Sequence, residues 1–135
     1  MKILIAGASG NLGSHLSQHL INGTQELRLL VHRSSLPFNI EGCENVSCCR
    51  ADLARPDTLE GVCTGIDCVV HLAGVLFAPL PERFLTKTNV DYVKNLVEAA
   101  KKPACGNSSW SVFRMSKARP LLITRRPDGW MQVQM

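Results

Sequence analysis

Residues 3–13 read Ile3-Leu4-Ile5-Ala6-Gly7-Ala8-Ser9-Gly10-Asn11-Leu12-Gly13, and this stretch decides the fold. An apolar run that can be buried on both faces leads directly into three glycines with the spacing G-x-x-G-x-x-G. Leu12, Leu16 and Leu20 then recur at helical spacing. The sequence therefore predicts a buried strand, a tight glycine turn and a helix in immediate succession.

Each glycine has a physical task at such a junction. Gly7 lets the chain turn sharply off the strand, and Gly13 lets the first helical turn pack against that strand. Gly10 leaves no Cβ between the backbone and a pyrophosphate, to which the helix N-terminus offers N–H groups and a partial positive charge. This pattern predicts a dinucleotide-binding site. The residues that it assigns to the cofactor are Gly7, Ser9, Gly10, Asn11, Leu12 and Gly13.

The body of the chain alternates between strand-like and helix-like segments. Further strands are predicted at about 27–31, 46–51 and 67–72, and helices at about 11–22, 55–63 and 86–102. Such alternation implies parallel strands joined by right-handed crossovers. We expect a Rossmann-like α/β fold whose doubly wound parallel sheet is incomplete, with about four strands in the order 3-2-1-4. Its crevice would lie between the first and fourth strands, beside the glycine turn.

Three further motifs accompany the glycine stretch. Asp52-Leu53 follows the third predicted strand, His71-Leu72-Ala73-Gly74 follows the fourth, and Thr88-Asn89-Val90 lies early in the long helix. With residues 7–13, they resemble the extended or atypical short-chain dehydrogenase/reductase superfamily. The similarity is greatest to its NAD-dependent epimerase/dehydratase branch and its NmrA-like NAD(P)H-binding branch, and it covers residues 1–102.

The resemblance implies roles for the matching positions. The glycines would hold the pyrophosphate, and Asp52 and Leu53 would lie beside the adenine. Ala73 and Gly74 would let the backbone approach the ribose, and Asn89 would lie near the nicotinamide end.

The positions outside the glycine stretch also have a purely structural interpretation. Asp52 could cap the short helix that Pro56 begins. Ala73-Gly74 could be a tight strand exit, and Asn89 a local helix-start group. His71 lies within an apolar run and is expected to be a packed core histidine rather than an acid or base.

The residues after the second strand bear on the choice of cofactor. A site selective for NAD usually carries an acidic residue about 20 residues beyond the glycines. Here Arg33 and Ser34 follow that strand, and the next carboxylate is Glu41. Arg33 can pair with a 2′-phosphate, and Ser34 can donate a hydrogen bond to it. The sequence therefore favours NADP(H) over NAD(H), with a solvated loop arginine as the alternative.

The sequence shows no pair of residues suited to proton transfer at a bound substrate. By the resemblance, catalysis would need a Tyr-x-x-x-Lys pair, in which the lysine lowers the pKa of the tyrosine. Tyr92 is the single tyrosine, and Leu96 stands four residues after it. We expect the cofactor half of an oxidoreductase or epimerase without this pair, so that its status as an enzyme stays open. The alternative is a non-catalytic NADP(H)-sensing or protein-interaction module.

The composition changes at about residue 102. Lys/Arg and Asp/Glu number ten each up to Lys102, and five against one afterwards. We expect a Rossmann half-domain at 1–102 and a divergent tail at 103–135, produced by an altered reading frame or splice junction or by real specialisation.

Within the tail, 121–124 and 130–133 flank a hairpin-like Pro127-Asp128-Gly129 turn, and 110–115 is a weaker strand candidate. We expect no tail segment to pair with the fourth strand, which leaves an open edge for self-association. A basic tail that binds nucleic acid is a weaker alternative.

The hydropathy and the cysteine spacing lead to expectations about the cellular location of the protein and about metal binding. The sequence shows no signal peptide and no apolar run long enough to cross a membrane, so we expect a cytoplasmic protein. The six cysteines lack C-x-x-C spacing and are expected to be reduced thiols. No metal site is expected, although Cys43, Cys48 and His71 form a conceivable zinc set.

Overall fold

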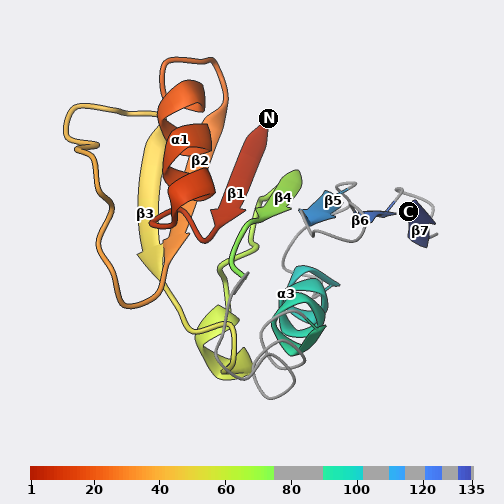
Figure 1. The fold of residues 1–135 in the computed structure, drawn as a ribbon. Helices are drawn as coiled ribbons and strands as arrows, with labels where there is room; N and C mark the ends of the chain where they lie inside the picture. Colours follow the sequence, from red (N-terminus) through yellow and green to blue (C-terminus); the bar gives the residue numbers. More distant parts are fainter. Residues whose placement is uncertain (75–89, 102–109, 115–120, 126–130, 135) are drawn as a thin grey trace.

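The computed structural model describes residues 1–74, 90–101, 110–114, 121–125 and 131–134 (Figure 1). The predicted alternation of strands and helices is confirmed over the first 74 residues. The elements run in the order β1 (Lys2–Ala6), α1 (Asn11–Leu20), β2 (Glu26–Val31), β3 (Val46–Arg50), the short 3-10 helix η1 (Pro56–Leu59), β4 (Cys68–His71), α3 (Tyr92–Lys101), β5 (Trp110–Arg114), β6 (Leu121–Arg125) and β7 (Met131–Gln134).

The sheet has the predicted central order. Its strands lie side by side as β3-β2-β1-β4-β5-β6-β7, and the first four are parallel. Ile3 of β1 stands opposite Leu27 of β2 on one side and Cys68 of β4 on the other. The strand order therefore reverses between β1 and β4, and a doubly wound sheet opens its crevice at this point.

The tail departs from our expectation. β5 pairs in parallel with β4, with Val69 opposite Val112, so the prediction that no tail segment joins the fourth strand is wrong. The four predicted strands keep their predicted order, and three strands from the tail extend the sheet to seven. A physical reason is that the edge of β4 presents backbone N–H and C=O groups, which even a short strand satisfies. The predicted hairpin segments do pair, since β6 and β7 are antiparallel with Ile123 opposite Val133, while its turn at 127–129 lies outside the described residues.

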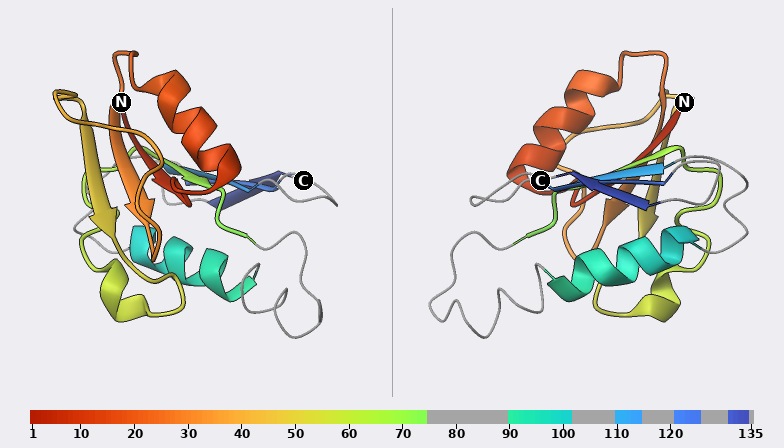
Figure 2. Two further views of the ribbon diagram at one scale, coloured as in Figure 1. Left: turned by 60° about the vertical axis from the view of Figure 1, so that its left-hand side comes forward. Right: turned by 90° about the vertical axis from the view of Figure 1, so that its right-hand side faces the viewer.

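Helices cover both faces of the sheet. Figure 2 shows α1 and α3 on opposite sides. The side chains of β1 alternate between the two core clusters on these sides. Ile3 and Ile5 pack in the core on the α1 side, with Leu16 and Leu20 against it. On the other face, Leu4 shares a core with residues from η1 and α3, namely Leu59, Val93, Leu96, Val97 and Ala100. This sandwich fixes where each strand ends.

The predicted helix at 55–63 is reduced to the four residues of η1, whereas the long predicted helix is present as α3 over Tyr92–Lys101. Residues 86–89 lie outside the described residues. His71 is 2% exposed, which confirms the expected core histidine. In the part of the chain that the structure describes, no helix is long and apolar enough to span a bilayer.

Candidate functional site

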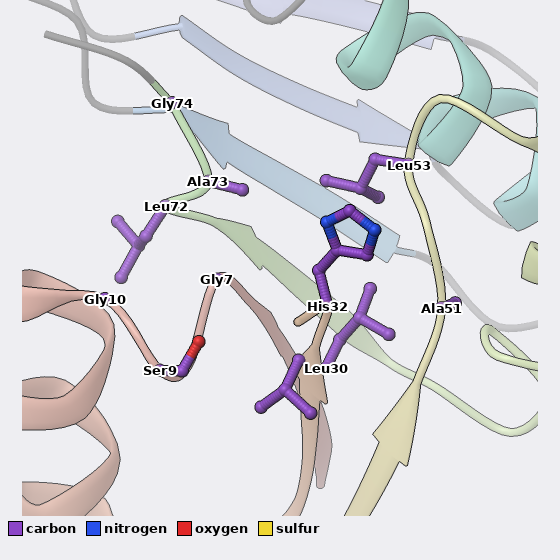
Figure 3. Close-up of a pocket in the computed structure, with 11 residues that line it drawn as sticks. Gly7, Ser9, Gly10, Leu30, His32, Ala51, Leu53, Leu72, Ala73 and Gly74 are labelled. Carbon is purple, nitrogen blue, oxygen red and sulfur yellow. The ribbon is translucent and has the colours of Figure 1, made fainter. Parts of the chain in front are cut away.

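A pocket of about 220 Å³ opens where the carboxyl ends of the central parallel strands meet (Figure 3). The turn after β1 forms one wall, and the ends of β2, β3 and β4 supply the rest. Its lining consists of glycine segments that expose their backbone, of apolar side chains and of one imidazole. The lining residues are Gly7, Ser9, Gly10, Leu30, Val31, His32, Ala51, Leu53, Leu72, Ala73 and Gly74.

Gly7 forms the floor of this pocket in a conformation that favours glycine. Its φ is +90°, and a Cβ on it would lie 2.6 Å from the backbone nitrogen of Ala73. The chain leaving β1 therefore presses directly on the chain leaving β4. The N–H groups of Gly7 and Ala8 both donate to the carbonyl oxygen of Leu30, at 3.1 and 3.2 Å, which ties the turn to β2 as well.

The other two glycines pack the first turn of α1 onto this floor. A Cβ at Gly13 would stand 2.0 Å from the carbonyl oxygen of Gly7, so helix and turn touch backbone to backbone. A Cβ at Gly10 would meet only that same oxygen, at 3.2 Å. Gly13 thus has the predicted packing role. Gly10 is exposed and lines the pocket, where a side chain would occupy ligand space.

The N-terminus of α1 is open to an anion. Gly10 is its N-cap residue, and within the described residues no side chain caps it and no acidic residue lies in its first turn. Its leading N–H groups and the helix dipole therefore point toward the pocket side of the glycine turn. An uncapped helix start beside a side-chain-free turn fits a phosphate or pyrophosphate.

His32 and Asp52 bridge the ends of β2 and β3 at the opposite rim. The His32 Nε2 atom lies 3.4 Å from Asp52 Oδ2. Asp52 Oδ1 accepts a 2.9 Å hydrogen bond from the Ala54 N–H, which forms a local turn. The N-cap of η1 is Arg55, and no side chain caps it among the described residues, so the interpretation of Asp52 as a helix cap is wrong.

Arg33 and Ser34 follow His32 but do not line the pocket. Both are exposed. The Arg50 guanidinium donates to the carbonyl oxygens of His32 and Arg33, the latter at 3.0 Å, and so holds the chain as it leaves β2. Two arginines therefore lie at this rim. The nearest carboxylate along the chain after β2 is Glu41, as the sequence indicated.

The predicted site residues fall into three groups. Ser9, Leu53 and Ala73 lie in the pocket with Gly7, Gly10 and Gly74. Asn11, Leu12 and Gly13 form the adjoining first turn of α1, whereas Arg33, Ser34 and Asp52 stand outside the lining. Asn89 lies outside the described residues.

The sequence analysis missed five lining residues. They close the ends of β2, β3 and β4, and the rule that ligands bind beyond the carboxyl ends of parallel strands could have found them. They are Leu30, Val31, His32, Ala51 and Leu72. The described residues hold no group of three or more His, Cys, Asp or Glu side chains that could bind a metal ion.

Comparison with known proteins gives concordant matches. Residues 3–113 match the model of the NAD dependent epimerase/dehydratase family. A uronate dehydrogenase from Pseudomonas putida is 29% identical, and the match covers 96% of this chain and 49% of that protein. A ceramide reductase from Caulobacter vibrioides is 32% identical over 73% of this chain and 31% of its own length. The chain thus spans about half or less of these curated relatives.

A solved structure shows the same similarity. It is a single-residue variant of the uronate dehydrogenase from Agrobacterium tumefaciens, complexed with NAD, with 32% sequence identity and a TM-score of 0.59. The match covers 73% of this chain and 36% of that protein.

Proposed function

Because the chain belongs to the NAD-dependent epimerase/dehydratase family, we propose that it binds a nicotinamide adenine dinucleotide in the pocket beyond β1, β2, β3 and β4. The observation that carries the proposal is the contact of Gly7 with Ala73 beside an uncapped helix start. Together they make an anion site with no side chain in the way.

The proposed pose follows the polarity of the pocket. The pyrophosphate lies over the glycine turn, with its charge facing the N-terminus of α1. The adenosine lies toward the β2 and β3 rim, where Leu53 offers an apolar wall. Ala73 and Gly74 leave room for a ribose at the end of β4, and Asn89 would face the nicotinamide end.

We infer further that NADP(H) is preferred to NAD(H). Arg33 and Arg50 place two permanent positive charges at the end of β2, and no carboxylate follows until Glu41. A 2′-phosphate near Arg33 would gain charge-assisted hydrogen bonds that a 2′-hydroxyl cannot match. The uronate dehydrogenase complex with NAD describes that protein, and the preference proposed here rests on the residues of this one.

The proposed biochemical role is the cofactor half of an NAD(P)-dependent oxidoreductase or epimerase. The second candidate is a non-catalytic NADP(H) sensor or interaction module. Within residues 1–135 the single tyrosine, Tyr92, is followed four residues later by Leu96 rather than by lysine, so these residues supply no Tyr-x-x-x-Lys pair of their own. The two differ in the partner they need. Co-purification of a separate chain that carries a Tyr-x-x-x-Lys pair would favour the cofactor half of an enzyme, whereas nucleotide-dependent binding to a regulatory protein would favour the sensor.

Titration of the purified chain with NADPH and NADH, followed by nicotinamide fluorescence, tests the binding proposal. Gly10→Val places branched carbons where the pyrophosphate would lie, so affinity should collapse while the protein remains folded. Gly23→Val is the control, since Gly23 lies beyond the opposite end of α1 and its new Cβ would chiefly displace the movable end of the Gln25 side chain. Unchanged affinity in a folded Gly10→Val protein would refute the site.

A further inference from the structure

The imidazole of His32 is the titratable side chain among the residues that line the pocket. It is half exposed and follows directly after β2, and Figure 3 shows its ring pointing toward Leu53. Arg33, the next residue, does not line the pocket. Of these two consecutive basic residues, His32 is therefore the one that lines the pocket.

The partner of His32 is a carboxylate held in place. Asp52 Oδ2 lies 3.4 Å from the His32 Nε2 atom, and its other oxygen accepts the hydrogen bond from Ala54. The Asp52 N–H also donates to the Thr58 hydroxyl at 3.0 Å. Both oxygens of Asp52 thus have partners inside the protein. The ion pair engages the Nε2 atom of the imidazole, so the other ring nitrogen, Nδ1, is not used by Asp52, and the half-exposed ring lines the pocket.

From this arrangement we propose that His32 and Asp52 form a pH-dependent element that discriminates NADP from NAD. The inference rests on the proposed function and refines it. A neutral imidazole leaves the pair with the single negative charge of Asp52, which repels a 2′-phosphate. A protonated imidazole cancels that charge and adds a donor. NAD carries a hydroxyl at this position and responds far less to either state.

The sign of the effect follows from these charges. Histidine is the side chain that ordinarily changes charge between about pH 5 and 8. The preference for NADP over NAD is therefore strongest in the acidic part of that range and falls as pH rises. The other charged groups at this rim are Arg33 and Arg50, which stay protonated throughout and contribute a constant attraction. They cannot produce the pH dependence.

The test compares the affinities of NADP⁺ and NAD⁺ by calorimetry at about pH 6 and about pH 8.5, in the full chain and in His32→Gln. The 2′-phosphate of the free nucleotide also titrates in this range, and that contribution cancels when the two proteins are compared at the same pH. We expect the NADP⁺ to NAD⁺ affinity ratio of the unaltered chain to exceed that of His32→Gln about fivefold at the lower pH. The two ratios should converge at the higher pH.

Asp52→Asn provides an independent variant. It keeps an oxygen for the Ala54 N–H and removes the negative charge, so the ratio should rise at about pH 8.5. Equal ratios in the unaltered chain and His32→Gln at both pH values would overturn the inference while leaving nucleotide binding intact. If the unaltered chain binds neither nucleotide, the proposed function itself fails, and the inference fails with it.

Discussion

The side-chain amide of Asn95 donates a 2.9 Å hydrogen bond to the carbonyl oxygen of Leu53. This bond joins α3, on one face of the sheet, to the segment that follows β3. Leu53 is buried and forms part of the pocket wall. The position of α3 therefore sets the position of the wall that would face an adenine.

Asn95→Leu should weaken both stability and nucleotide affinity. It removes the donor and leaves a partly buried carbonyl without its partner, at a cost of about 1–3 kcal/mol. Chemical denaturation and NADPH titration measure the two effects. Lys94→Leu, at an exposed neighbouring position, is the control. If Asn95→Leu behaved like this control in both assays, the bond would have no role in placing the wall.

Gly13→Ala should destabilise the fold more than Gly10→Ala does. The new Cβ at position 13 would lie 2.0 Å from the carbonyl oxygen of Gly7, whereas the one at position 10 would lie 3.2 Å from it. Relieving the first clash requires a backbone shift, and overpacking of this kind costs about 1–3 kcal/mol. Thermal unfolding of the two variants gives the comparison. Equal melting temperatures would contradict the close packing of α1 on the turn.

Arg33→Asp should shift the preference from NADPH toward NADH. The substitution replaces attraction by repulsion at the 2′-phosphate, and charge-assisted hydrogen bonds are worth about 1.5–3 kcal/mol, or roughly tenfold or more in affinity ratio. Arg55→Asp is a suitable control, because Arg55 is exposed and pairs with Asp57. An unchanged NADPH to NADH ratio in Arg33→Asp would leave Arg33 as a solvated loop residue.

Cys48 should react slowly with iodoacetamide despite its exposure. Partial burial raises the pKa of its thiol, and the Arg50 guanidinium only partly offsets this. Since the thiolate is the nucleophile, less of it is present near neutral pH and the rate should rise as the pH increases. Arg50→Gln should raise the pKa further and slow the reaction, as peptide mapping of the labelled protein can show. Faster labelling of Cys48 in Arg50→Gln would contradict the expected effect of Arg50 on the pKa of the thiol.

Ending the chain after residue 102 should promote self-association. The truncation removes β5, which pairs with β4, and exposes that edge of the sheet. A chain ending after residue 125 retains β5 and β6 and serves as the control. Size-exclusion chromatography distinguishes the two. A monodisperse 1–102 fragment that elutes as a monomer would show that the β4 edge needs no cover.

The sequence predicted the central sheet because its signals are local. The apolar run before Gly7 and the glycine spacing identify a strand, a turn and a helix without reference to the rest of the chain. The pairing of β5 with β4 could not be read in this way, because it depends on an edge formed by residues 68–71 meeting a short segment about 40 residues later.

Part of the pocket lining could be predicted for a similar reason. Gly7, Gly10 and Ala73 lie in short local motifs, and all three line the pocket. The proximity of His32 to Asp52 depends on where two neighbouring strands end relative to each other. Asn95 reaches Leu53 across 42 positions of sequence, and no local pattern contains that contact.

The contact between Gly7 and Ala73 makes one wall of the pocket far less tolerant of substitution than the rim opposite it. Where backbone presses on backbone, substitution at Gly7 is excluded by both φ and space, so that wall is fixed in shape. At the rim, residues 32–34 after β2 are exposed and Asp52 after β3 is partly exposed, so these side chains can be exchanged without disturbing the sheet. An engineer who wished to retarget the pocket to another nucleotide would therefore work at positions 32–34 and 52, and would leave the glycine floor as it is.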